Sequence, residues 1–191
     1  NLSASPFDYT HNADRQAAVK ANVLKYGIPM FYCNGVGSQT EIVFDGASLV
    51  FDKNANLCGK LASFKEDGKA FVLNKDGTIE GAIIEDAMLL PDEESNPANL
   101  EAALNIEEVY EALIMGISDY FSKMGFQKAI LGSSGGIDSA VTLVLACHAL
   151  GKENVKAILM PSEYSTGHSV FDAEQLSKNL NNPYEIISIK N

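Results

Sequence analysis

The stretch "AILGSSGGIDSAVTLVLA", residues 129–146, constrains the fold more than any other part of this chain. A short apolar run stops at a loop of serine and glycine and a longer apolar run follows, which predicts a buried strand leading into a helix. Similar runs alternate beyond it, and together they predict parallel βαβ units in a doubly wound sheet. The expected elements are strands over 128–131, 155–160 and 184–189 and helices over 138–150 and 170–180, the second helix with Ser169 as its N-cap.

The first half of the chain has a different pattern of predicted elements, in which a helix precedes an antiparallel meander. We expect a helix over 13–26, a buried strand at "IPMFYCN" and a turn at "GVGSQ". Hairpins are expected over 41–64 and 69–84, the second with Asp76-Gly77 in its turn. This order is typical of an α+β fold.

The two patterns of predicted elements meet near residues 86–104, which carry Pro91, Pro97 and a cluster of three acidic residues. We interpret this segment as a linker. A helix is expected after it with Asn105 as N-cap, because Glu108 completes a capping box. Its expected buried face consists of Val109, Leu113, Ile117, Tyr120 and Met124. The predicted organisation is a first domain over 1–87, a linker over 88–104 and a second domain over 105–191.

The serine- and glycine-rich loop has the chemistry of an anion site. Gly132 through Gly136 are expected to present consecutive backbone N–H groups at the start of a helix, where the helix dipole also favours an anion. The lysine of a Walker A motif is missing, because Ile137 and Asp138 follow Gly136. Hydroxyl donors are expected from Ser133, Ser134 and Ser139.

Asp138 leaves two interpretations of this loop open. A carboxylate repels phosphate unless a divalent cation lies between them, and Mg²⁺ typically binds one or two carboxylates together with substrate phosphates. The loop therefore predicts an Mg·ATP site with a metal-bridging aspartate. The other interpretation is an ordinary strand-to-helix turn in which Asp138 complements the helix dipole.

Charge and composition argue against several classes of protein. A formal net charge of −11 is unfavourable for nucleic acid as the main partner. No apolar run reaches the ~18 residues that a membrane-spanning helix needs, and the first residues lack the features of a secretory signal. Three widely spaced cysteines are typical of a reduced cytoplasmic protein. Both ends stop beside strand-like runs, so we expect the chain to be part of a longer protein.

The segment "SGGIDS", residues 134–139, resembles the PP-loop of the N-type ATP pyrophosphatases, which cleave ATP between its α- and β-phosphates. Its surroundings over 110–180 resemble the synthetase domain of NAD⁺ synthetases. Ser133 departs from that family, which commonly has an apolar residue there, and we expect altered loop packing rather than loss of ATP binding. The ATP-binding residues that the resemblance implies are Gly132, Ser133, Ser134, Gly135, Gly136, Ile137, Asp138, Ser139 and Met160, with Mg²⁺ at Asp138.

The first hundred residues resemble the C-terminal part of a nitrilase-type glutaminase domain, an αββα sandwich, through "SASPF" and "YGIPMFYCNGVGSQTEIVFDGAS". The two resemblances together form the pattern of glutamine-dependent NAD⁺ synthetases. The glutaminase Glu, Lys and Cys are expected upstream of this chain, so no catalytic residue is expected within it. Cys33 is interpreted as a buried structural cysteine. The implied glutamine-binding residues are Ser5 and His11, although lysine or arginine is common in place of His11.

The resemblance implies amidation of deamido-NAD⁺ to NAD⁺ through an adenylated intermediate, driven by ATP with Mg²⁺ and supplied with ammonia from glutamine. Two alternatives are another PP-loop amidotransferase and a fragment without catalytic activity. The implied partners are small-molecule substrates and further copies of the chain, without nucleic acid or membrane, in the cytoplasm.

Overall fold

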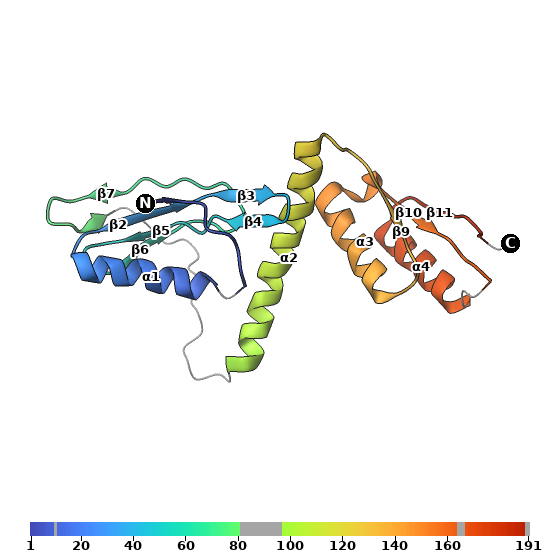
Figure 1. The fold of residues 1–191 in the computed structure, drawn as a ribbon, viewed down its shortest axis with the longest axis horizontal. Helices are drawn as coiled ribbons and strands as arrows, with labels where there is room; N and C mark the ends of the chain where they lie inside the picture. Colours follow the sequence, from blue (N-terminus) through green and yellow to red (C-terminus); the bar gives the residue numbers. More distant parts are fainter. Residues whose placement is uncertain (10, 81–96, 164–166, 190–191) are drawn as a thin grey trace. The chain divides into compact units, whose positions relative to one another are not determined.

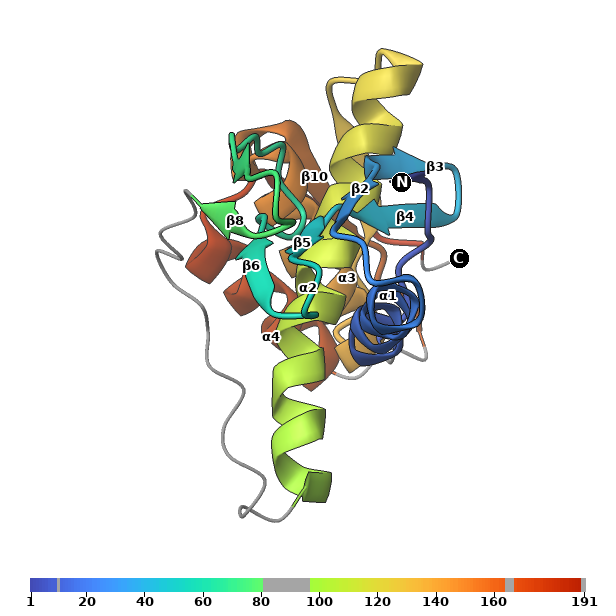
Figure 2. The same cartoon turned by 90° about the vertical axis from the view of Figure 1, so that its left-hand side faces the viewer.

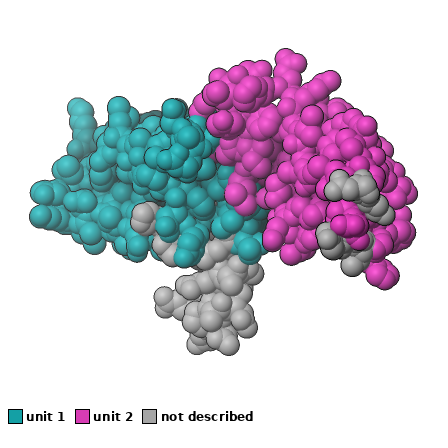
Figure 3. Space-filling model, turned by 45° about the vertical axis from the view of Figure 1, so that its right-hand side comes forward, with its two compact units in different colours: residues 1–112 teal, residues 113–191 magenta. Residues whose placement is uncertain are grey.

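The computed structural model describes residues 1–9, 11–80, 97–163 and 167–189 (Figure 1). The chain forms two compact units, residues 1–112 and 113–191, coloured separately in Figure 3. The first part contains β1 (Leu2–Ser3), α1 (His11–Tyr26), β2 (Met30–Asn34), β3 (Val36–Gln39), β4 (Ile42–Asp45), β5 (Leu49–Phe51), β6 (Leu57–Lys60), β7 (Val72–Leu73) and β8 (Ile79–Glu80). The rest contains α2 (Pro97–Met124), β9 (Ala129–Gly132), α3 (Ile137–Leu150), the short 3₁₀ helix η1 (Lys152–Asn154), β10 (Val155–Leu159), α4 (Gly167–Leu180) and β11 (Tyr184–Ile186).

The first unit is built on a four-stranded sheet of order β1-β2-β5-β6. β1 runs parallel to β2, and the other two pairings are antiparallel. Helix α1 runs along this sheet in Figure 1 and is seen nearly end-on beside it in Figure 2. Its residues Val19 and Val23 are buried against Tyr32, Leu49 and Phe51, so one helical stripe closes one small core. The predicted helix is confirmed, and it begins two residues earlier than expected.

The segment "GVGSQ" forms strand β3 rather than the expected turn. β3 pairs with β4 in an antiparallel register that runs from Val36 opposite Asp45 to Gln39 opposite Ile42. The strand expected over 41–52 is thereby divided into β4 and β5, with Gly46 between them at a φ of 68°. The β5–β6 pairing agrees with the first expected hairpin and the β7–β8 pairing with the second, whose last residues, 81–84, lie outside the described residues.

Helix α2 begins at Pro97, eight residues before the expected N-cap, so Asn105 lies inside the helix. Proline is favoured in the first turn of a helix because its missing N–H has no intrahelical acceptor there. Of the predicted linker, residues 88–96 lie outside the described residues and 97–104 are helical. The face expected to be buried is partly open: Leu113, Tyr120 and Met124 are 46%, 45% and 55% exposed, because no layer of described residues covers them.

The second unit contains a parallel three-stranded sheet of order β11-β10-β9. α3 and α4 pack on one face of it, where Leu143 and Ala173 meet Val155, Ala157 and Leu159 in a fully buried core. The predicted parallel sheet with alternating helices is confirmed, and most boundaries agree to within one residue. α4 begins at Gly167, so Ser169 lies in its first turn and is not its N-cap.

Within the described ranges, none of the helices combines the length and apolarity that crossing a membrane requires.

Candidate functional site

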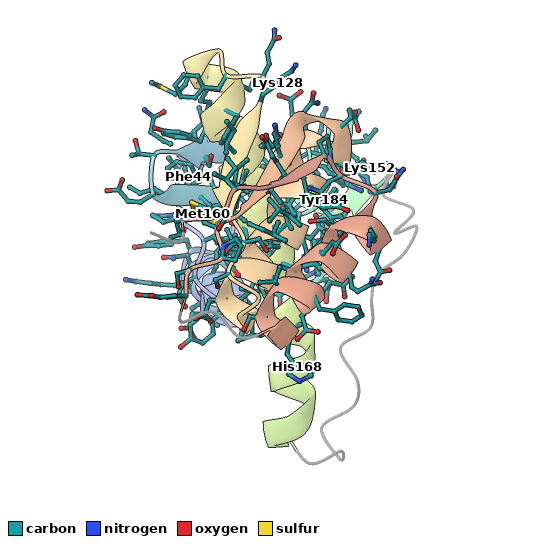
Figure 4. All side chains as sticks on the ribbon, turned by 90° about the vertical axis from the view of Figure 1, so that its right-hand side faces the viewer. Phe44, Lys128, Lys152, Met160, His168 and Tyr184 are labelled. Atoms are coloured by element: carbon teal, nitrogen blue, oxygen red, sulfur yellow. The ribbon has the colours of Figure 1, made fainter. Side chains whose placement is uncertain are left out.

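The loops that follow β9 and β10 lie at the same edge of the parallel sheet, because both strands end there. In Figure 4, Lys128, which precedes β9, lies at the top of the view, and Met160, just beyond β10, lies lower and to the left. A cavity of about 190 Å³ opens between the two loops. Its apolar wall is formed by Leu159, Met160, Pro161 and Val170, and its polar side by Ser133, Ser134 and Ser169.

The loop between β9 and α3 is held by its own hydroxyl groups. The Ser139 hydroxyl accepts a hydrogen bond from the Ser134 N–H at 3.2 Å and donates to the Gly136 carbonyl at 2.9 Å. The Ser134 hydroxyl accepts from the Gly136 N–H at 3.3 Å and lies 3.1 Å from that of Ser139. Gly136 is the N-cap of α3 with an extended backbone and no side-chain capping bond. The N–H groups of Ser134 and Gly136 are thus occupied only by rotatable hydroxyls, which an anion can replace.

The N–H of Ser133 belongs to the sheet and is not among the loop N–H groups available to an anion. Its N–H donates to the Ile158 carbonyl at 2.9 Å, which extends the β9–β10 ladder by one residue. The expectation of consecutive exposed N–H groups from Gly132 to Gly136 is therefore wrong at this position. The first N–H group of the loop that does not belong to the sheet is that of Ser134.

The Ser133 hydroxyl is a buried group without a partner. The residue is 5% exposed, and its Oγ has no hydrogen-bond acceptor or donor among the described residues. The expected contribution of this hydroxyl to the cradle is not seen in the structure. Because the side chain follows Ala129 and Leu131 on the core side of β9, an apolar residue would suit the position better.

Asp138 lies in the first turn of α3, where its exposed carboxylate complements the helix dipole. No cluster of three His, Cys, Asp or Glu side chains suited to a metal occurs in the described parts of the chain. A single carboxylate beside an anion cradle is a donor set that fits Mg²⁺ held mainly by substrate phosphates and water. Both interpretations of Asp138 therefore agree with its position.

A larger hollow of about 380 Å³ lies at the amino ends of β9 and β10. Its walls include Phe121, Phe126 and Asn154. None of its lining side chains is ionisable, and it is remote from the carboxyl edge where ligands bind in parallel sheets. The smaller cavity is therefore the better candidate site.

In the first unit, Ser5 is half-buried and both of its main-chain groups are bonded to the side chain of Asn34. His11 is the first residue of α1. Cys33 is exposed, which corrects the expectation of a buried cysteine: it alternates on β2 with Tyr32 and Asn34, which face the interior. Sequence reasoning missed Arg15 and Asp45, a buried ion pair of 2.9 Å whose members lie 30 residues apart in the chain.

Fold and loop together define the class of the second unit, an α/β domain with a serine- and glycine-rich loop, without a Walker A lysine, at the carboxyl edge of a parallel sheet. Residues 109–191 match the family model described as NAD synthase. The chain is 38% identical, over 94% of its length, to a glutamine-dependent NAD(+) synthetase of Synechocystis sp.. It is 35% identical, also over 94% of its length, to one of Thermotoga maritima. The chain spans about a third of these curated relatives, 30% and 34% of their lengths.

A solved structure shows similarity to the same family of enzymes. Glutamine-dependent NAD+ synthetase from Acinetobacter baumannii, in complex with ADP, superposes on 98% of this chain with a TM-score of 0.84 and 31% identity. The chain covers 33% of that structure. The resemblance to glutamine-dependent NAD⁺ synthetases that the sequence predicts is therefore confirmed over nearly the whole chain.

Proposed function

We propose that this chain takes part in the ATP-dependent amidation of deamido-NAD⁺ to NAD⁺, with ammonia derived from glutamine. The observation that carries the proposal is the similarity, over 94% of the chain, to enzymes named glutamine-dependent NAD(+) synthetase. The anion-cradle loop of the second unit agrees with it. The Acinetobacter baumannii relative contains ADP, which supports ATP as the nucleotide here.

The cavity beside the loop offers suitable surroundings for both the base and the phosphates of an adenine nucleotide. The apolar wall of Leu159, Met160 and Val170 offers a flat base a surface to pack against. The N–H groups of Ser134 and Gly136, at the start of α3, would bind the phosphates in place of the two hydroxyls that occupy them. The hydroxyls of Ser134 and Ser139 would then turn toward the phosphate oxygens as further donors.

Asp138 is the residue that would hold Mg²⁺ against those phosphates, and the ion would supply charge neutralisation for the leaving pyrophosphate. The other loop groups need no metal for their role. Backbone donors fixed at a helix start stabilise developing negative charge without reorganisation, which agrees with the absence of a loop lysine.

In the proposed reaction the nicotinate carboxylate of deamido-NAD⁺ attacks the α-phosphorus of ATP. An acyl-adenylate forms and pyrophosphate leaves. Ammonia then attacks the acyl carbon, the amide forms, and AMP leaves with the electron pair of the broken C–O bond. The residues of this chain bind and orient the nucleotide for the first step.

Within the first unit we propose the C-terminal part of a nitrilase-like glutaminase domain over residues 1–87, followed by a connecting segment over 88–104 whose last residues, 97–104, belong to α2. Ser5 and His11 are its proposed glutamine contacts. The synthetase part begins at 105 in this scheme. A cytoplasmic location and assembly into homo-oligomers complete the proposal.

The test is ATP–pyrophosphate exchange measured on the full-length protein with deamido-NAD⁺ as acceptor. The proposal expects exchange that depends on deamido-NAD⁺ and on Mg²⁺. Exchange stimulated by xanthosine monophosphate or by aspartate instead would assign the chain to another amidotransferase. An absence of exchange with every acceptor would favour a non-catalytic role.

A further inference from the structure

A buried polar network connects three separate segments of the first unit. Its centre is Asp45 at the end of β4, which is completely buried. The Arg15 guanidinium donates two hydrogen bonds to the Asp45 carboxylate, both at 2.9 Å, and the Asn34 amide donates a third at 3.2 Å. Arg15 and Asn34 are 9% and 7% exposed, so this network is shielded from water.

The side chain of Asn34 links the network to the main chain of Ser5 by hydrogen bonds. The Ser5 N–H donates to the Asn34 Oδ1 at 2.8 Å, and the Asn34 Nδ2 donates back to the Ser5 carbonyl at 3.3 Å. The Asn34 N–H is fixed in turn by the Ser48 hydroxyl at 3.0 Å. These bonds use only main-chain groups of Ser5, so its side chain stays outside the network.

The other arm of the network ends on α1. Arg15 lies four residues after His11, one helical turn along α1, so the ion pair fixes the helix close to its first residue. Ser5 and His11 are thus both tied to one carboxylate, the first through Asn34 and the second through the backbone of the helix that carries Arg15.

Hydrophobic packing alone does not explain why this core contains an ion pair. Well-packed apolar groups often stabilise an interior as much as a buried pair does, because the charges lose their hydration. Directional hydrogen bonds, in contrast, fix orientation. A network that reaches Ser5 and the start of α1 therefore has the properties of a support for a binding site.

We propose that Asp45, acting through Asn34 and Arg15, is a positioning residue for the glutamine site: it holds the Ser5 segment and the beginning of α1 in the geometry that binds glutamine. This inference rests on the proposed function of the first unit. Asp45 touches no substrate in this scheme, and its effect reaches glutamine only through the placement of Ser5 and His11.

The test compares NAD⁺ formation by the full-length protein with glutamine and with ammonia as nitrogen donor. Asp45→Asn keeps the size of the side chain but places an N–H₂ group against Arg15 or Asn34, both of which are donors. We expect the KM for glutamine to rise by about tenfold or more, with kcat changed less than about threefold and the ammonia-driven rate unchanged. Asn34→Ala, which spares the ion pair and removes the bonds to Ser5, should raise the same KM.

Asp52→Asn is the matched control. Asp52 is also a buried aspartate of the first unit, 7% exposed, but within the described residues the hydrogen bonds of its carboxylate come from the turn at Asn54 and Asn56. This variant should lower stability and leave the KM for glutamine within about twofold of wild type.

An unchanged KM in folded Asp45→Asn would overturn the inference, and so would equal effects of Asp45→Asn and Asp52→Asn on glutamine-driven turnover. If Asp45→Asn does not fold, the KM of Asn34→Ala decides between the same outcomes. A wild-type protein that uses ammonia but not glutamine would instead overturn the glutaminase proposal on which the inference rests.

Discussion

The carbonyl oxygen of Ser169 occupies the space where a side chain on Gly135 would project. A Cβ on Gly135 would lie 2.1 Å from that oxygen, and the φ of Gly135 is +83°, a left-handed conformation that glycine adopts readily. The first turn of α4 therefore packs directly on the backbone of the loop. A larger residue at 135 has to displace either the loop or the helix.

We expect Gly135→Ala to destabilise the protein by more than the about 1–2 kcal/mol that a left-handed alanine costs. Gly125→Ala is the control, because Gly125 has a φ of +73° and a Cβ added there would meet no atom of the described residues within 4 Å, its chain neighbours aside. The difference in unfolding free energy between the two variants, measured with denaturant, isolates the clash with Ser169. Equal losses would contradict the close contact.

Ser133→Ala should stabilise the protein by about 1 kcal/mol, because it removes a buried hydroxyl that has no partner among the described residues. ATP affinity should be retained, since the Ser133 N–H is bonded to the sheet in either case. Denaturant unfolding and calorimetric ATP binding measure the two effects. Ser139→Ala is the control and should be destabilising, because the Ser139 hydroxyl bonds Ser134 and Gly136. A loss of stability in Ser133→Ala would show instead that the Ser133 hydroxyl has a hydrogen-bond partner.

Asp138→Asn should reduce the deamido-NAD⁺-dependent ATP–pyrophosphate exchange of the full-length protein by about 100-fold, because the proposed Mg²⁺ ligand loses its charge. The unfolding free energy should change by less than about 1 kcal/mol, since the side chain is exposed and contributes chiefly to the helix dipole. An exchange rate equal to that of wild type would leave Asp138 with the helix-dipole role alone.

Asp52 predicts a pH dependence of stability in the first unit. Burial raises its pKa, but hydrogen bonds from the Asn56 side chain and from the backbones of Asn56 and Asn54, with Lys53 nearby, outweigh burial and place the pKa below the usual 3.8. A lowered folded-state pKa stabilises the protein above about pH 4, and this stabilisation is lost as the pH falls through the folded-state value.

Asp52→Asn should therefore lower the unfolding free energy by about 1–2 kcal/mol at pH 7. The difference from wild type should shrink as the pH is reduced toward about 2, where both forms are uncharged at this position. Thermal unfolding of both proteins across this pH range measures the difference in stability. A difference independent of pH would mean that the charge of Asp52 plays no part.

Several features of this protein follow from local sequence. The alternation of apolar runs with helical segments after residue 129 predicts the parallel sheet of β9, β10 and β11, and the structure agrees. The position of the serine- and glycine-rich loop between a strand and a helix is predicted in the same way. Periodicity and turn chemistry depend on neighbouring residues, so one sequence suffices to show them.

Other features depend on partners that are distant in the chain. The N–H of Ser133 is used by Ile158, the side-chain space of Gly135 is filled by Ser169, and "GVGSQ" becomes a strand because β4 is there to pair with it. Periodicity indicates which face of an element is buried but not which atoms meet it. The sequence by itself thus determined the order of elements and the kind of loop. Only the tertiary structure decided which N–H groups of the loop are used by the sheet, and that Asp45 joins Arg15 to Asn34, because both depend on the register between segments far apart in the chain.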